Sequence, residues 1–298
     1  LIVLFLIVSL LLFLFAGDIG GLLADAKAYT PEDIQWEWYH GSMSDMSTFE
    51  SGLALVIAIT AAEMFSQGNW QRAWASESDK ALKQGACMAA ALVLPLVFAM
   101  GVLGTAVAGQ GAVEDPAASF FYLIEGAETW LVAAFIVLAI ALVASSADTL
   151  QNAIVASISR DLSDGKMGIR YARFWTIGLM IPAIYLATGP TIGGFTLDAI
   201  GVFEIFLFAD LLATATVAPV LLTLWDKVSA KGALFGAVSG LLSVIIYGTL
   251  TADISTGFNY ILHPTNEFGL ANLDIFLAAL IGSALVTVMG SYAMPDEY

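Results

Sequence analysis

Long apolar blocks alternate with short polar connections along almost the whole chain. A membrane-spanning helix needs roughly 20 predominantly apolar residues, and we count eight blocks that approach or exceed this length. They cover residues 1–17, 52–67, 86–109, 129–157, 171–189, 200–225, 232–252 and 272–292. Only 12% of the 298 residues are charged, against about 25% in soluble domains. The pattern predicts an all-α polytopic membrane protein that crosses the lipid bilayer eight times.

The connections between these blocks leave no room for a soluble domain. The single cysteine, Cys87, excludes a disulfide framework within the chain. No Walker loop, dinucleotide fingerprint, zinc-binding helix or nucleophile elbow occurs. His40 and His263 lie in predicted loops without the spacing of metal ligands. We therefore expect no enzyme activity, no organic cofactor and no nucleic-acid partner.

The ten basic residues are unevenly distributed, and this predicts the orientation of the helices. Nine of them fall in the connections 68–85, 158–170 with the start of the next helix, and 226–231, and only Lys27 lies elsewhere. Basic residues mark the cytoplasmic side of a membrane, and these connections alternate with acidic ones. We predict a multi-pass protein of the plasma membrane with Tyr298 at the cytoplasmic face.

Two further features concern the ends and the surface of the protein. Leu1 already lies inside an apolar run with no basic segment before it. This is not the pattern of a signal peptide, so we expect N-terminal helices of the same protein to precede it. The net charge is −16, which indicates either a high-salt habitat, where salt screens like charges, or an acidic outer face that attracts cations.

A carboxylate and a weak point for the helix occur together at the end of the second block. Glu63 lies within the apolar residues, where an isolated carboxylate is costly and faces a partner or a polar cavity. The following residues 66–69, which include Gly68, weaken helix continuity. One interpretation is an interrupted helix whose free backbone groups bind a solute. The other is a simple helix end anchored by Arg72 at the cytoplasmic interface.

The fourth block carries several polar side chains near its C-terminal end. Ser145, Asp148 and Thr149 share one helix face because their spacing is i, i+3 and i+4. Hydroxyl, carboxylate and carbonyl oxygens suit a hard cation, although small residues with back-bonding hydroxyls also serve close helix packing. In the block 200–225, Glu204 and Asp210 have several interpretations: proton carrier, gate, or structural pairing with a neighbouring helix, which is the simplest.

Three segments together resemble the sodium/solute symporter family, which includes sodium-coupled transporters of sugars, proline, pantothenate and sialic acid. Residues 71–78 are similar to its Gln-Arg signature on a cytoplasmic loop, with Ser76 and Glu77 where Ala-Lys is usual. Residues 144–162 resemble the helix that carries the family's shared sodium site. Residues 218–227, followed by glycines 232, 236 and 240, resemble its Pro-x-Leu-Leu and Gly-Ala-x-x-Gly pattern.

The resemblance implies a LeuT-type fold of five plus five helices in an inverted repeat. Residues 1–298 would form one transmembrane transporter domain, with core helices 5–10 in residues 1–225 and two accessory helices in residues 226–298. Core helices 1–4 would belong to the missing N-terminal part. The implied function is sodium-coupled symport of a small organic solute by alternating access; the alternative is the membrane sensor domain of a histidine kinase.

The resemblance also implies site residues. Ser145, Ser146 and the carbonyl of Leu142 match the family's sodium ligands, with Na⁺ as the co-transported ion. Asp148 and Thr149 match a second sodium site of some members, in which position 148 carries a hydroxyl. The positions that face solute in relatives correspond to Ile59, Glu63 and Gln67. An acid at position 63 is unusual in the family and predicts a solute with a cationic group.

Overall fold

The computed structural model describes residues 46–108, 119–122, 128–163, 202–266 and 269–296, together with Ile124 and scattered residues between 166 and 196. The helices fall into two compact units. Of the described residues, those from Gln71 to Ala172 belong to unit 1. Those before Gln71 and after Ala172 belong to unit 2.

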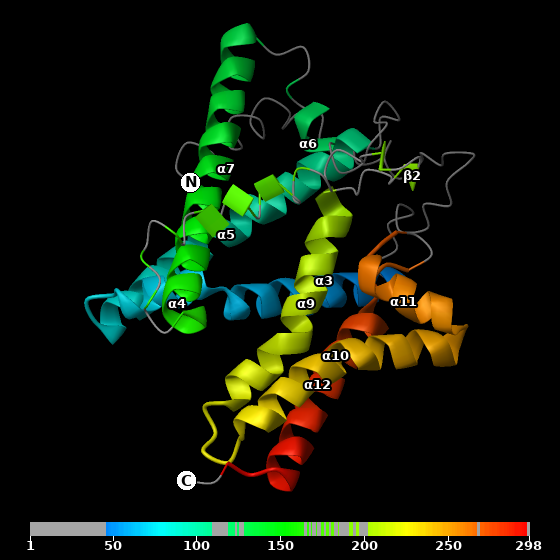
Figure 1. The fold of residues 1–298 in the computed structure, drawn as a ribbon. Helices are drawn as coiled ribbons and strands as arrows, with labels where there is room; N and C mark the ends of the chain where they lie inside the picture. The colour runs from blue at the N-terminus through cyan, green and yellow to red at the C-terminus, as the bar shows by residue number, and fades with distance from the viewer. Residues whose placement is uncertain are drawn as a thin grey trace. The chain divides into compact units, whose positions relative to one another are not determined.

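Unit 1 is built on two long apolar helices, which Figure 1 draws in cyan and green. These are α5 (Asp79–Ala108) and α7 (Thr129–Ser157), with the short helix α6 (Ser119–Tyr122) against α5 and a π-helical turn η3 (Ile158–Leu162) that continues α7. The rings of Phe121 and Phe135 pack edge to face, with 5.9 Å between their centroids. Most side chains of α5 and α7 are exposed within unit 1, as expected of helices that are apolar all round and face lipid or further helices.

Unit 2 is a helix bundle with one small hairpin. Its helices are α3 (Met46–Phe65), the first half of α4 (Gln67–Trp74), α9 (Val202–Leu222), α10 (Ala230–Thr251), α11 (Ile254–Leu262) and α12 (Leu273–Ala293). The hairpin consists of β1 (Thr191–Ile192) and β2 (Phe195–Thr196), in which Thr191 pairs with Thr196 in antiparallel register. Neither this hairpin nor α11 was predicted from the sequence, because both are too short to give an apolar block.

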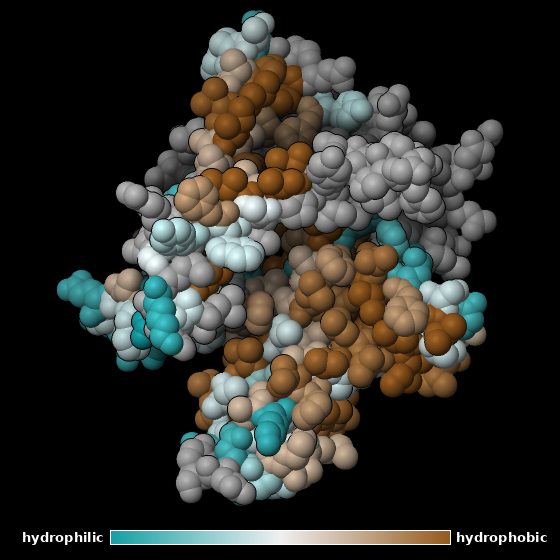
Figure 2. Space-filling view, viewed as in Figure 1, coloured by the Kyte–Doolittle hydropathy of each residue, from teal (hydrophilic) through white to brown (hydrophobic). Residues whose placement is uncertain are grey.

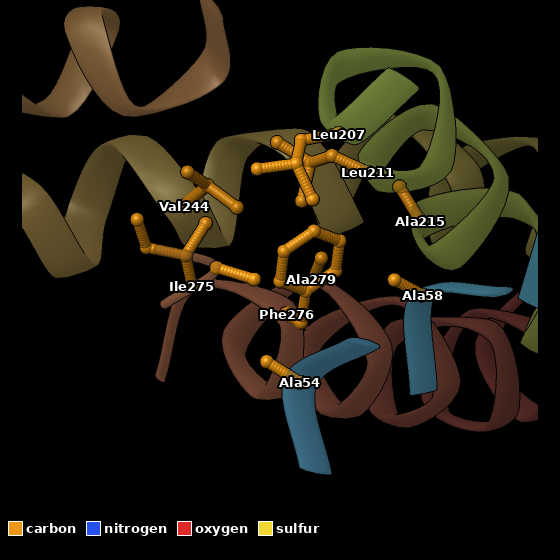
Figure 3. Packing of buried hydrophobic residues seen from close by; sticks show 10 residues of the cluster. Ala54, Ala58, Leu207, Leu211, Ala215, Val244, Ile275, Phe276 and Ala279 are labelled. Carbon is orange, nitrogen blue, oxygen red and sulfur yellow. The ribbon is translucent and has the colours of Figure 1, made fainter. Parts of the chain in front are cut away.

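Helix α9 is central in unit 2 because it packs against α3, α10 and α12. Its buried residues Leu207, Leu211 and Ala215 recur every four residues, which places them on one helix face. Figure 3 shows them against Ala54 and Ala58 of α3, and against the core residues Val244, Ile275, Phe276 and Ala279 of α10 and α12. The alanines of α3 are small enough to bring the backbone of α3 close to α9.

Helices α10 and α12 run antiparallel, with glycines of each helix against small polar side chains of the other. Buried residues recur every four positions along α10, and all of them except Val244 are glycines, at positions 232, 236, 240 and 248. A Cβ atom on Gly236 would overlap Thr287 Oγ1 of α12, and one on Gly240 would lie 2.8 Å from Ala215 Cβ of α9. Small residues at such spacing let transmembrane helices approach closely and gain van der Waals contacts. The glycines that resemble the family pattern therefore have a packing role.

Side chains cap the ends of α10 and α11. Ser229 Oγ accepts a hydrogen bond from the Gly232 N–H at 3.0 Å, and the Ser229 N–H donates to Ser291 Oγ of α12 at 3.1 Å. At the start of α11, Asp253 Oδ1 accepts from the Thr256 N–H at 2.7 Å, and this hydrogen bond lowers the pKa of the Asp253 carboxyl. These contacts satisfy backbone donors that a helix leaves free at its first turn.

The exposed faces of unit 2 are apolar. Figure 2 shows hydrophobic residues spread over the helices of this unit, with hydrophilic residues gathered near helix ends. Leu242, Ile246, Leu285 and Met289 are each at least half exposed. In water such a surface would aggregate, whereas in a bilayer it contacts lipid tails.

The predicted apolar blocks coincide with helices wherever the structure describes them. Block 129–157 coincides with α7, and blocks 232–252 and 272–292 match α10 and α12 within two residues. Block 1–17 lies outside the described residues, and 171–189 lies largely outside them. In the described part of the chain, five helices are long and apolar enough to cross a membrane, or six if α3 and α4 form one bent span. The chain is thus a polytopic helical membrane protein, and the five-plus-five arrangement stays a prediction.

The glycine packing gives a testable prediction. Gly236→Ala should lower the thermal unfolding midpoint of the purified protein, because the added methyl group overlaps Thr287 and overpacking typically costs about 1–3 kcal/mol. Gly52→Ala is the matched control, because Gly52 has nothing within 4 Å of its Cβ position on α3. That control should be neutral or slightly stabilising. Equal midpoints for the two variants would contradict the close packing.

Candidate functional site

The segment that contains Glu63 is a broken helix. Helix α3 ends at Phe65, α4 begins at Gln67, and their axes differ by 58°. Residues Phe49–Phe65 and Gln67–Trp74 together are long and apolar enough for one membrane span. The sequence left this interruption open beside a simple helix end, and the structure shows that the helix breaks at Ser66 and resumes in a new direction.

Two side chains of α4 satisfy backbone groups that the break leaves free. Asn69 Nδ2 donates to the carbonyl oxygen of Glu63 at 3.1 Å, and Trp70 Nε1 donates to the carbonyl oxygen of Met64 at 2.7 Å. A helix has no internal partner for its last carbonyl groups, and lipid offers none. Asn69 and Trp70 therefore make the break tolerable within an apolar span.

The predicted solute-facing residues lie around this break. Ile59 and Glu63 are one turn apart on α3, and both side chains are exposed in unit 2. Gln67, the first residue of α4, is also exposed. The carboxylate of Glu63 accepts a hydrogen bond from Asn69 Nδ2. The break thus presents an acid, two amide side chains and an apolar surface close to the middle of the combined span.

The environment of Asp210 differs from the prediction from the sequence, which favoured structural pairing with a neighbouring helix. This residue lies near the middle of α9, is only 3% exposed, and its Oδ2 atom has no hydrogen-bond partner. The signal in the sequence was one carboxylate at the centre of an apolar block, but the lack of a partner was not visible there.

Glu204, by contrast, does pair with another segment. Its Oε1 atom lies 3.2 Å from Nδ1 of His263, the residue that follows the last turn of α11. Both side chains are partly exposed, and Glu204 is in the first turn of α9. For this acid the contact supports the structural interpretation, with His263 as its partner.

The predicted sodium ligands lie on α7 in unit 1. The side chains of Ser145, Ser146 and Asp148 are exposed, and Leu142 is 39% exposed. Among the described residues of unit 1, none covers the hydroxyl pair, and its assignment as a sodium site stays a prediction.

Thr149 is engaged in other contacts. Its hydroxyl donates to the carbonyl oxygen of Ser145 at 3.0 Å and accepts from Nη2 of Arg72 at 3.4 Å. A guanidinium group beside Thr149 repels a cation at that hydroxyl. The contacts favour the back-bonding role for Thr149 over the role of a second sodium ligand.

Comparison with known proteins points to transport. Over 204 residues the chain is 31% identical to the spermidine transporter DUR31 of Candida albicans. The aligned region is 66% of this chain and 38% of that transporter, so the chain matches well under half of the relative's length. No family model and no solved structure matches the chain. The chain is related to a membrane transporter.

The break at Ser66 can be tested through its side-chain contacts. Asn69→Ala should lower the free energy of unfolding by about 1–3 kcal/mol, because the Glu63 carbonyl and carboxylate both lose a donor. Gln67→Ala, at the start of the same helix, is the control and should change it by less than about 0.5 kcal/mol. Denaturant or thermal unfolding in detergent measures both. A neutral Asn69→Ala would show that its amide does not stabilise the break.

Proposed function

We propose that the chain is part of a sodium-coupled secondary transporter of the sodium/solute symporter family, and that its solute is a small organic amine carrying ammonium groups. The observation that carries this proposal is Glu63 at the break of a membrane span, in a chain related to a spermidine transporter. Spermidine belongs to the polyamines, which are cationic at neutral pH. The solute class we propose is therefore the polyamines.

The chemistry of the break suits such a solute. An ionised carboxylate in an apolar span is strongly disfavoured unless a counter-charge accompanies it. A primary ammonium group offers one positive charge and three hydrogen-bond donors. The Glu63 carboxylate and the Gln67 side-chain oxygen are acceptors for these donors, and the exposed Ile59 side chain offers apolar contact to methylene groups.

Sodium would bind on α7, through the hydroxyl groups of Ser145 and Ser146 and the carbonyl oxygen of Leu142. Hard cations prefer such oxygen ligands. The remaining ligands would come from the N-terminal helices of a LeuT-type fold, in which sodium binding biases the equilibrium between outward-open and inward-open states. Asp148, whose side chain is exposed one turn further on, would add negative charge near this ion.

Orientation and alternative functions follow from the same observations. With basic connections on the cytoplasmic side of the plasma membrane, the end of α4 that carries Arg72 and the α9–α10 connection would both face the cytoplasm. The relationship to a transporter favours transport over the sensor of a histidine kinase.

Sodium coupling predicts a specific effect at Ser145. In the full-length protein, spermidine uptake should require a sodium gradient, and Ser145→Ala should raise the sodium concentration for half-maximal uptake about tenfold. One lost ligand costs on the order of 1–3 kcal/mol. Thr129→Ala, at the start of the same helix, is the control. Unchanged sodium dependence in Ser145→Ala and in Ser146→Ala would refute the sodium assignment.

Solute pairing predicts a different effect at Glu63. Glu63→Gln keeps the shape and an acceptor for Asn69 but removes the charge, so spermidine affinity should fall at least tenfold while sodium binding is kept. Glu50→Gln, an exposed acid on the same helix, is the matched control and should bind as the unaltered protein does. Binding of radiolabelled spermidine to purified protein measures both. Unaltered affinity in well-folded Glu63→Gln would argue against the pairing.

A further inference from the structure

Helix α11 follows the spanning helix α10 and packs against it (Figure 1). It has nine residues, Ile254–Leu262, and none of them is charged. At about 1.5 Å per residue it is roughly 13 Å long, whereas the hydrocarbon core of a bilayer is about 30 Å thick. Helix α11 is therefore too short to span a membrane, and its place after the end of α10 puts it near one membrane surface.

One face of α11 is packed within unit 2. Gly257 is buried, and a Cβ atom there would overlap the carbonyl oxygen of Ile245 of α10. The ring of Tyr260 stacks on the ring of Tyr247, with 6.2 Å between their centroids. Tyr247 also donates its hydroxyl proton to Oδ2 of Asp274, in the first turn of α12, at 2.9 Å. Tyrosines are typical of the interface between lipid and water, so these contacts place α11 at that level.

A second face of α11 carries a stripe of large apolar side chains. Ile254, Phe258 and Leu262 recur every four residues, which aligns them along the helix. Their exposed fractions are 63%, 57% and 55%. The adjoining end of α10 exposes Ile246 and Leu250. Both helices therefore present apolar side chains at this end of unit 2.

A third face of α11 is polar. Ser255 and Asn259 are exposed, and each follows a residue of the apolar stripe, Ile254 or Phe258, by one position. One position turns a helix by about 100°, so the two polar side chains lie beside the stripe. At the start of the helix, the exposed carboxylate of Asp253 accepts a hydrogen bond from the Ser255 hydroxyl at 2.9 Å. A helix that lies in the membrane surface has this division, with its apolar side in lipid and its polar side in water.

We propose that α11 is an interfacial anchor whose stripe of Ile254, Phe258 and Leu262 inserts at the boundary between lipid headgroups and acyl chains. Lipid fits this surface because the exposed apolar face of α10, the preceding helix, already requires it. The inference is independent of the proposed function, since it concerns the outer surface and not the solute site. His263, which follows α11, contacts Glu204 in the first turn of α9, so the anchor also connects the membrane surface to the start of α9.

The test places nitroxide spin labels on single cysteines of the full-length protein in lipid bilayers. Cys87 and any other cysteine are first replaced by serine. Phe258→Cys and Asn259→Cys are a matched pair, because these neighbours are both exposed and differ in the face they occupy. Ile254→Cys and Ser255→Cys repeat the comparison one turn earlier. Collisions of each label are measured with molecular oxygen, which partitions into lipid, and with a neutral nickel chelate, which stays in water.

The two faces should give different collision ratios. At Phe258→Cys and Ile254→Cys, the ratio of oxygen to chelate collisions should be several-fold higher than at Asn259→Cys and Ser255→Cys. Ile246→Cys, on the exposed face of α10, is the control for a lipid-facing position. Its ratio should be at least as high as the ratio on the stripe, because it lies about one turn before the end of a spanning helix.

Two outcomes would overturn the anchor. Frequent collisions with the chelate at all four positions of α11 would mean that the helix lies in water. Few collisions with either reagent on the stripe, together with immobilised labels, would mean that protein covers it, either a second copy or another segment of the full-length chain. A variant that unfolds shows a lower thermal midpoint than the cysteine-free protein, and the other pair of positions then decides.

Neither outcome would bear on amine transport, which uptake measures separately.

Discussion

The structure depends on one constraint, that a backbone in hydrocarbon must satisfy its own hydrogen bonds. Helices meet this constraint along their length, and the long apolar helices α5, α7, α9, α10 and α12 are the result. The same constraint explains the local chemistry at Ser66. There the helix breaks, and Asn69 and Trp70 supply donors from side chains to the carbonyl groups of Glu63 and Met64.

Close packing of small residues is the second factor, because it holds the helices of unit 2 together. In a bilayer no hydrophobic effect drives one helix against another, so contacts between backbones must do so. The glycines of α10 allow α12 and α9 to approach until no Cβ atom would fit at Gly236 or Gly240. The alanines of α3 act similarly against α9. This packing buries the middle of α9, and with it Asp210.

The proposed solute chemistry follows from these two constraints together. The break in α3 exposes Glu63 near the middle of a span, and the packing of α9 buries a second carboxylate, that of Asp210. Neither acid has a basic partner among the described residues that pack around α9. In the function proposed above, the ammonium group of the solute supplies the counter-charge for Glu63.

The sequence by itself determined the helices and many of their polar positions, because apolar length, charge and glycine spacing are local properties. The block 129–157 coincides with α7, and Glu63 was identified as a candidate at a weak point in its helix. Only the tertiary structure decided which polar groups have partners. It paired Glu204 with His263, put Arg72 beside Thr149, and left the Oδ2 atom of Asp210 buried without a hydrogen bond. The reason is that a partner belongs to another helix, and which helices meet depends on packing between segments distant in the chain.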